Sequence, residues 1–117
     1  MLTLGNVAID CSDAAALASF YATLLDRPVD PGASEYFATI GRGATTPVLM
    51  FLKVPDRTPG KNSVHLDLHT DTLADEIARA VSLGAKHLAD FDQYGAVWAT
   101  FADPEGNVFD IGTSAPA

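Results

Sequence analysis

Polar and apolar residues alternate along several short stretches of this chain, and alternation with a period of two predicts β-strands. The clearest stretch is residues 64–69, where Leu66 and Leu68 would face a core. The positions between and beside them, which would share the opposite face, are His65, Asp67 and His69. Similar patterns predict further strands at residues 4–10, 36–40, 48–54, 86–91, 97–101 and 108–112. The stretch 48–54 differs from the others because it is apolar on both faces.

Apolar residues spaced three or four apart predict one helix in each half of the chain. The first helix covers residues 14–25 and is capped by Ser12 or Asp13. Its apolar stripe is Leu17, Phe20, Tyr21 and Leu24. The second helix follows a cap at Thr70, Asp71 or Thr72, and its stripe is Leu73, Ile77, Ala80 and Val81. Gly84 then lies where the end of a helix favours a left-handed residue.

We read each half as a strand, a helix and three short strands, with residues 36–40 and 48–54 as the strand stretches identified after the first helix, and an offset of 59 places Asn6 on His65. We predict a single α+β domain of two such modules, residues 1–54 and 64–117, joined by a linker at 55–63. Each sheet would be covered by a helix on one face only, so the uncovered faces would curl towards one another. Those faces carry Asn6 and Asp10 in the first half, and His65, Asp67 and His69 in the second.

Composition and charge narrow the range of partners. Fifteen acidic against seven basic residues give a net charge of -8, which argues against nucleic acid and anionic membrane surfaces. Cys11 is the single cysteine, which excludes an internal disulfide, and we expect it to be a small buried apolar residue. The first residues lack the basic segment of a signal peptide, and no apolar run is long enough to span a bilayer. We therefore expect a cytoplasmic protein.

Several motifs, taken in order, resemble the vicinal oxygen chelate superfamily, which includes glyoxalase I, bleomycin- and fosfomycin-resistance proteins and extradiol dioxygenases. The resemblance covers nearly the whole chain. The residues that show the resemblance are 7–13 followed by 20–25, then 65–68, 83–85 and the turn and strand at 103–110. The opening motif and the His-Leu-Asp-Leu strand are most similar to the bacterial glyoxalase-like subgroup. The resemblance implies two βαβββ modules that form a curved mixed sheet around a concave cavity, with the helices on the outer face.

In metal-using members of this superfamily, four strands contribute one ligand each to a divalent ion that binds substrate oxygens. By resemblance, His65 and Asp110 occupy two of these positions and Asn6 a third. The fourth position falls in residues 48–52, which hold no carboxylate, amide or imidazole, although Asp67 could substitute for it. The resemblance therefore implies a metal site at His65 and Asp110 for zinc, nickel, manganese or iron, with a reduced ligand set.

Other residues are candidates for proton transfer or ligand contact. His65 and Asp67 share a strand face and would form an acid–base pair. The remaining candidates, which would contact a small molecule, are Asn6, Asp10, His69, Met50, Leu52 and Trp98.

Three functions remain open at this point. The chain would be a metal-free binding protein of the bleomycin-resistance type, a divalent-metal lyase or isomerase of the glyoxalase type, or a metal-free enzyme that uses His65 and Asp67. We favour a glyoxalase-like protein that binds a small organic molecule and leave catalysis open. We also expect a homodimer, because short two-module chains of this superfamily commonly pair and residues 48–52 are too apolar for an exposed surface.

Overall fold

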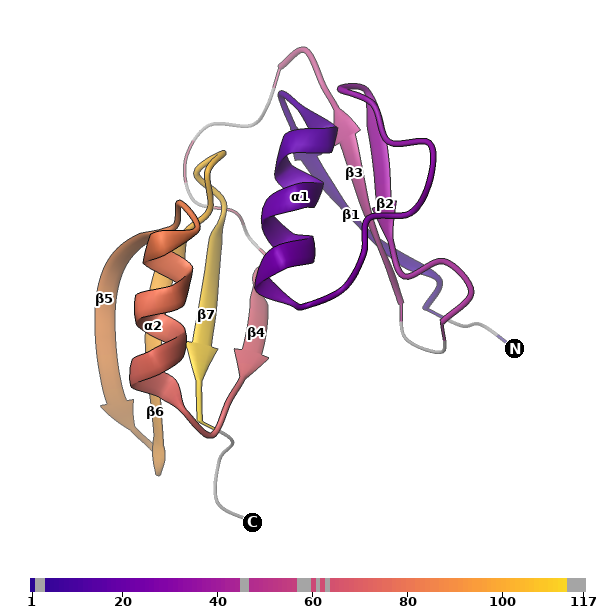
Figure 1. Ribbon diagram of the computed structural model, residues 1–117. Coiled ribbons are helices and arrows are strands. Elements are labelled where there is room, and N and C mark those ends of the chain that lie inside the picture. Colours follow the sequence, from indigo (N-terminus) through magenta and orange to yellow (C-terminus); the bar gives the residue numbers. More distant parts are fainter. Residues whose placement is uncertain (2–3, 45–46, 57–59, 61, 63, 114–117) are drawn as a thin grey trace. The chain divides into compact units, whose positions relative to one another are not determined.

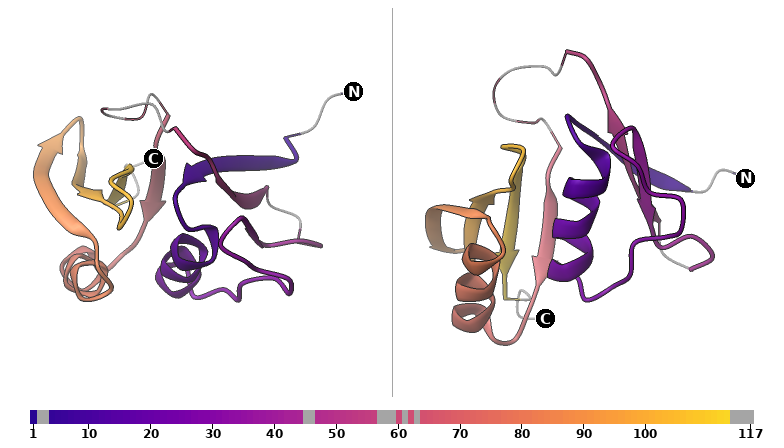
Figure 2. Two further views of the ribbon diagram at one scale, coloured as in Figure 1. Left: turned by 90° about the horizontal axis from the view of Figure 1, so that it is seen from above. Right: turned by 45° about the horizontal axis from the view of Figure 1, so that its top comes forward.

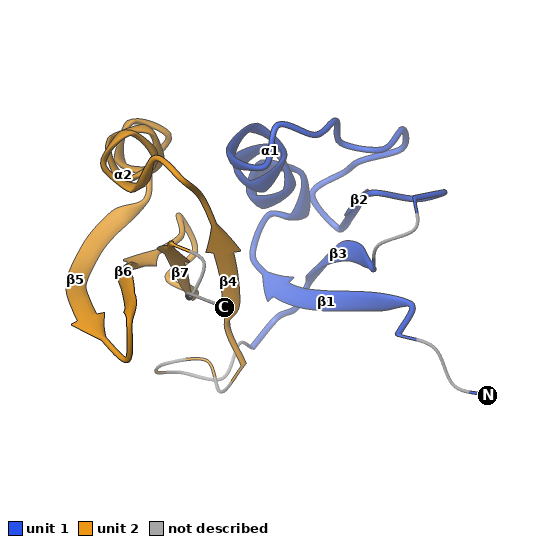
Figure 3. Cartoon of the chain, turned by 90° about the horizontal axis from the view of Figure 1, so that it is seen from below, with its two compact units in different colours: residues 1–59 blue, residues 60–117 orange. Residues whose placement is uncertain are grey.

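The computed structural model describes residues 1, 4–44, 47–56, 60, 62 and 64–113, which hold two helices and seven strands (Figure 1). In chain order these are β1 (Asn6–Cys11), α1 (Ala14–Leu24), β2 (Phe37–Ile40), β3 (Val48–Lys53), β4 (Leu66–His69), α2 (Leu73–Ser82), β5 (Lys86–Gln93), β6 (Ala96–Ala102) and β7 (Val108–Gly112). They fall into two compact units, residues 1–59 and 60–117 (Figure 3). Of the predicted linker, residues 57–59, 61 and 63 lie outside the described part of the chain.

The first unit is built on a three-stranded sheet of order β1-β3-β2, in which β1 runs parallel and β2 antiparallel to the central β3. The prediction of three strands after the helix is wrong for the described residues of this unit, where two strands follow α1. In place of the third, Val29 makes a single antiparallel bridge to Ile40. Pro28 and Pro31 flank Val29, and proline removes the backbone donors that a longer ladder would need.

Helix α1 covers one face of this sheet (Figure 2). It starts at Asp13, whose Oδ1 accepts a hydrogen bond from the Ala16 backbone N–H at 3.1 Å, so Asp13 is the cap rather than Ser12. The predicted apolar stripe is confirmed, because all four of its residues are buried, and Tyr21 stacks on Phe51 with 5.8 Å between ring centres. Cys11 is buried as predicted, with its Sγ 3.4 Å from the carbonyl oxygen of Leu52.

The second unit has a four-stranded sheet of order β4-β7-β6-β5, with β4 parallel to β7 and the other pairs antiparallel. Helix α2 lies on one face of it (Figure 2). Phe101 and Phe109 are fully buried and stack at 5.4 Å between ring centres. In α2, Ala80 is buried as predicted, whereas Val81 is 48% exposed and does not belong to the apolar stripe.

The two units share one connectivity. In each, the opening strand pairs in parallel with the closing strand, and the strand before the closing one pairs with it antiparallel. This repeat confirms the predicted α+β fold of two related modules. The predicted placement of the two sheets around a shared cavity stays a prediction.

Two tight turns join the last three strands. Tyr94 and Gly95 join β5 to β6 with φ angles of 56° and 77°, as a two-residue hairpin turn requires. Between β6 and β7, Asp103 Oδ1 accepts hydrogen bonds from the backbone N–H groups of Glu105 and Asn107, at 2.8 and 2.9 Å. In the described residues, neither helix has the length and apolarity of a membrane-spanning segment.

Candidate functional site

Polar side chains form a row across three neighbouring strands of the second unit. Asp67 on β4 is the direct partner of Asp110 on β7, which is in turn the partner of Thr100 on β6. Directly paired residues point to the same side of a sheet. Phe101 and Phe109, which occupy alternate positions of β6 and β7, are buried. The row therefore lies on the face opposite the apolar core of this unit.

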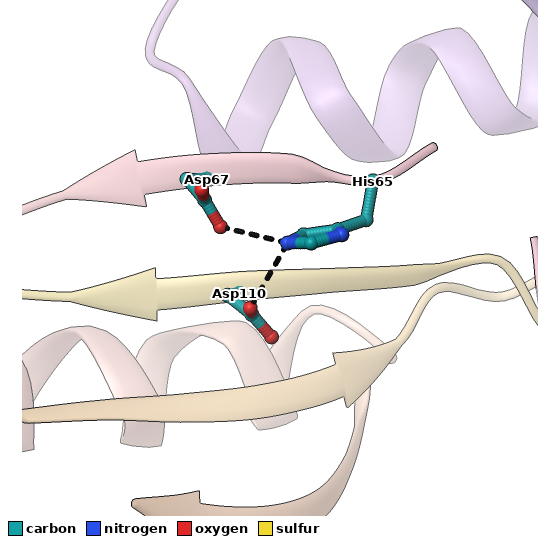
Figure 4. A group of neighbouring side chains, drawn as sticks. All are labelled: His65, Asp67 and Asp110. Atoms are coloured by element: carbon teal, nitrogen blue, oxygen red, sulfur yellow. Dashed lines mark ion pairs between the residues drawn. The ribbon is translucent and has the colours of Figure 1, made fainter. Parts of the chain in front are cut away.

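His65 completes this row into a cluster (Figure 4). Its Nε2 lies 3.1 Å from Asp67 Oδ1 and 3.3 Å from Asp110 Oδ2. One atom from each of the three residues lies within 4.8 Å of the others. His65 was predicted to be part of the strand, but β4 begins at Leu66, so the imidazole comes from the residue that leads into it. The structure thus brings together the predicted acid–base pair and the predicted metal ligands.

A hydrogen bond from the side chain of Asn62, rather than strand pairing, holds the residue that precedes His65. The Asn62 amide accepts a hydrogen bond from the Val108 backbone N–H at 2.7 Å and donates to the Val108 carbonyl at 3.2 Å. The same amide nitrogen donates to the carbonyl of Val64. Asn62 therefore binds the first residue of β7 as a neighbouring strand would, and its bond to Val64 holds the residue that precedes His65.

The three members of the cluster differ in exposure and in support. The side chains of Asp67, His65 and Asp110 are 61%, 40% and 17% exposed, respectively. Asp110 receives a second contact, because Thr100 Oγ1 donates a 2.6 Å hydrogen bond to its Oδ1. The Asp110 carboxylate thus uses one oxygen for Thr100 and the other for His65.

The donor set fits a divalent cation. Ligand atoms about 2.1 Å from one ion, at right angles to each other, lie about 3.0 Å apart. The 3.1 and 3.3 Å separations from His65 Nε2 to the two carboxylate oxygens are close to that value. One imidazole nitrogen and two carboxylates suit zinc, manganese, iron or nickel. The same separations also suit an Nε2–H group that is shared between two carboxylates.

Aromatic side chains lie beside the cluster on the same face. Two residues from Thr100 on β6, Trp98 stacks on Phe91 of β5 with 5.1 Å between ring centres and 18° between ring planes. Trp98 pairs with Gly112, which pairs on its other side with His69. A Cβ atom at Gly112 would come within 2.7 Å of Trp98 Cβ, so the strands approach closely here because residue 112 has no side chain. His69 is exposed at the end of β4 and lies outside the three-residue cluster.

The candidates of the first unit lie on one face of its sheet. Asn6 and Asp10 are exposed on β1, and Met50 and Leu52 are half-buried on β3. Met50 pairs with Ala8 as Asp110 pairs with Asp67, so a thioether occupies the register position that holds a carboxylate in the second unit. In the described residues, this unit contributes no member to the cluster that could hold a metal ion.

Three residues beside the cluster were not predicted from the sequence. Thr100 and Phe91 acquire their places from the cross-strand register of β5, β6 and β7, which strand periodicity does not reveal. Asn62 lies in the predicted linker, where an asparagine is an ordinary loop residue. An asparagine three residues before an ionisable strand position was the one local signal available.

Comparisons with known proteins agree with the fold. The profile of the glyoxalase-like domain family matches residues 6–112. A glyoxalase/bleomycin resistance protein/dioxygenase family enzyme from Burkholderia phytofirmans PsJN is similar at 22% identity and TM-score 0.79, over 96% of this chain and 98% of that one. A glyoxalase-related enzyme from Fulvimarina pelagi has 17% identity and TM-score 0.77, over 97% and 89% of the two chains.

A lactoylglutathione lyase from Agrobacterium tumefaciens is more distant in sequence, at 13% identity and TM-score 0.70, over 97% of this chain and 95% of that one. No curated protein matches the chain. The solved structures establish likeness of fold, and the family profile covers most of the sequence. The chain belongs to the glyoxalase-like domain family of the vicinal oxygen chelate superfamily.

Proposed function

We propose that this protein binds a small organic molecule on the face of its second sheet that carries His65, Asp67 and Asp110, opposite the apolar core of that unit. The observation that carries the proposal is the adjacency of two unlike groups on that face. His65, Asp67 and Asp110 offer polar contacts, and the stacked rings of Trp98 on β6 and Phe91 on β5 offer an apolar surface on the same face. An apolar surface with a few converging polar groups is typical of ligand sites.

The charge of the cluster indicates the kind of ligand. Two carboxylates face one imidazole, and the whole chain carries a net charge of -8. An anionic ligand would meet repulsion from Asp67 and Asp110, whereas a cation or a neutral hydrogen-bond donor would be attracted. A flat ring would stack on the aromatic pair, and the ring faces would favour a cation further. We therefore propose an aromatic ligand with a cationic or donor group.

Three matched probes test this proposal: benzamidinium, neutral benzamide and anionic benzoate. Trp98 is the only tryptophan of the chain, so its fluorescence reports on this face of the sheet. We expect saturable quenching in the order benzamidinium, benzamide, benzoate. Asp110→Asn should weaken benzamidinium binding about tenfold, the size expected for one charge-assisted hydrogen bond.

The control for this experiment is Asp90→Asn. Asp90 pairs with His87 at 2.7 Å elsewhere in the same unit, so this substitution changes a histidine–aspartate pair without touching the cluster. Benzamidinium affinity should be unchanged in it. Equal behaviour of the three probes, or equal effects of the two substitutions, would overturn the proposal.

A second candidate function, divalent-metal lyase or isomerase activity, is favoured by the convergence of three donor atoms. His65, Asp67 and Asp110 would hold the ion and leave other coordination positions for a ligand. Bound there, a divalent ion supplies Lewis acidity towards a ligand oxygen. Native mass spectrometry of chelator-stripped protein with zinc, nickel, manganese and iron(II) tests it. One ion per chain, lost in His65→Ala and Asp110→Ala but kept in His87→Ala, is the supporting result.

A metal-free acid–base role uses the same residues differently. With Nε2–H directed at the two carboxylates, the lone pair of neutral His65 lies on Nδ1, which then accepts a proton from the ligand. This role predicts turnover in the presence of chelator. Turnover that is restored only by added metal would exclude it.

We also propose that the chain forms a homodimer through the apolar face of β3. Val48, Met50 and Leu52 are half-buried on the face of this strand opposite the buried Phe51. Sedimentation of the wild type and of Met50→Lys over a range of concentrations tests this. We expect a dimer that the substitution dissociates, and a monomer at every concentration of the wild type would contradict it.

A further inference from the structure

We infer that Thr100 is a positioning residue that makes Asp110 the fixed acid of the cluster and leaves Asp67 as the adjustable one. The inference rests on the proposed ligand site and deepens it, because it assigns different roles to two carboxylates that look equivalent in sequence. Two successive contacts carry the inference. His65 contacts Asp110 on β7, and Asp110 contacts Thr100 on the neighbouring strand β6.

The geometry divides the two oxygens of Asp110. Thr100 Oγ1–H donates to Oδ1 at 2.6 Å, a short distance typical of a hydroxyl bonded to a charged acceptor. Oδ2 is left to face His65 Nε2 at 3.3 Å. Rotation of the carboxylate about its Cβ–Cγ bond would break the hydrogen bond from Thr100. Because the side chain is only 17% exposed, water is poorly placed to replace that bond.

Asp67 has no comparable support. Its side chain is 61% exposed, and among the described residues it makes an ion pair with His65. Ordering an exposed carboxylate costs side-chain entropy that one solvent-facing ion pair hardly offsets. Asp67 is therefore free to turn towards a ligand or an ion while Asp110 keeps the imidazole in place.

The first unit contains a natural comparison for Thr100. Thr39 pairs with Met50 as Thr100 pairs with Asp110, so the two threonines hold equivalent register positions. With a thioether opposite it, the Thr39 hydroxyl donates instead to Asp30 Oδ2 at 2.8 Å. Thr100 therefore bonds to the cluster because its cross-strand partner is a carboxylate, whereas Thr39 lacks such a partner and bonds elsewhere. Thr39→Val provides a matched control.

The first test needs no ligand and reads the ring nitrogens of His65 by ¹⁵N NMR, at an alkaline pH at which the ¹⁵N shifts themselves show a neutral ring. In an Asp67→Ala background, Asp110 alone orients the ring, so we expect the Nε2–H form to persist. Adding Thr100→Val should shift the ring towards a mixture of both tautomers, and Thr100→Ser should restore the Nε2–H form. Unchanged ring signals in the Asp67→Ala/Thr100→Val protein would overturn the inference.

The second test measures the affinity for Mn²⁺ alone. Loss of an outer partner of a metal ligand typically weakens binding 10- to 100-fold. We expect a loss of about tenfold or more in Thr100→Val, near-complete recovery in Thr100→Ser and no change in Thr39→Val. Equal losses in Thr100→Val and Thr39→Val would indicate a merely structural role and would overturn the inference. If the wild type takes up no Mn²⁺, the metal candidate fails by itself and the ring-nitrogen test still decides the role of Thr100.

Discussion

Asp67 and Asp110 are direct partners in the parallel pairing of β4 with β7, so two carboxylates stand side by side on one face of a sheet. Like charges in opposed positions destabilise a sheet. Here His65 Nε2 lies within 3.3 Å of both acids and offsets part of that repulsion. The arrangement costs stability unless something positive occupies the space between the carboxylates.

The first prediction follows from this repulsion. In chelator, Asp67→Asn should raise the free energy of unfolding by about 0.2–1 kcal/mol, because the amide keeps a hydrogen-bond acceptor for His65 and removes one charge. Urea unfolding measures the change. Asp92→Asn, an exposed position on β5, is the control that alters net charge equally. Destabilisation by Asp67→Asn relative to Asp92→Asn would contradict the idea.

Asn62 carries the second prediction. Asn62→Ala leaves the backbone N–H and carbonyl of Val108 without the partner that the amide supplies, and we expect a loss of about 1–3 kcal/mol in the free energy of unfolding. Hydrogen exchange at the Val108 N–H should accelerate. Asn6→Ala, an exposed position of β1, should change neither quantity. Continued protection of Val108 in Asn62→Ala would show that the amide is dispensable.

The third prediction concerns the close approach of β6 and β7. A Cβ atom at Gly112 would lie 2.7 Å from Trp98 Cβ and 2.9 Å from the Val97 carbonyl oxygen, so Gly112→Ala must push the strands apart. We expect a loss of about 1–3 kcal/mol in the free energy of unfolding, together with a shift of Trp98 fluorescence. Gly5→Ala meets no atom within 4 Å and is the control. Similar stability of the two variants would refute the steric argument.

A fourth prediction concerns acid stability. The backbone N–H of Arg42 and the hydroxyl of Thr39 both donate to Asp30 Oδ2, and they lower the pKa of this carboxyl from its ordinary value of 3.8. A lowered folded-state pKa stabilises the fold above the ordinary value, and this stabilisation is lost as the pH falls through the folded-state pKa. Asp30→Asn should therefore destabilise the protein at pH 6 and less so at pH 3.

Urea unfolding at the two pH values measures this dependence. Asp56→Asn, which replaces an exposed carboxyl in the same unit, controls for the loss of charge. A difference between wild type and Asp30→Asn that stays constant between pH 6 and pH 3 would contradict the assigned cause of the pKa shift.

Much of the fold could be predicted from local sequence because periodicity and turn chemistry act over a few residues. Strand β7 spans the predicted residues 108–112, and α1 ends one residue before its predicted end. The missing strand after α1 shows the limit of this reasoning. Pro28 and Pro31 end the helical pattern in the sequence, but that they limit the pairing of Val29 to one bridge depends on the strand that lies beside it.

For the candidate site, the sequence could predict which residues share one face of a strand, but not which residues lie opposite them on neighbouring strands. The alternation of β4 placed Asp67 beside His65, and the resemblance to metal-using relatives added Asp110. Thr100 was missed because its role depends on which residue of β6 lies opposite Asp110, and that register is decided by the whole sheet. Asn62 was missed because a side chain that replaces a strand partner leaves no periodic signal.

The amide of Asn62 has a consequence for how this site is able to change over evolution. Residues inside a ladder cannot shift without moving the whole sheet, but Val64, which precedes His65, is bound by the side chain of Asn62. The same side chain also bonds the backbone of Val108 at the start of β7. A substitution at position 62 would therefore alter the orientation of the imidazole and the local stability of the sheet edge together.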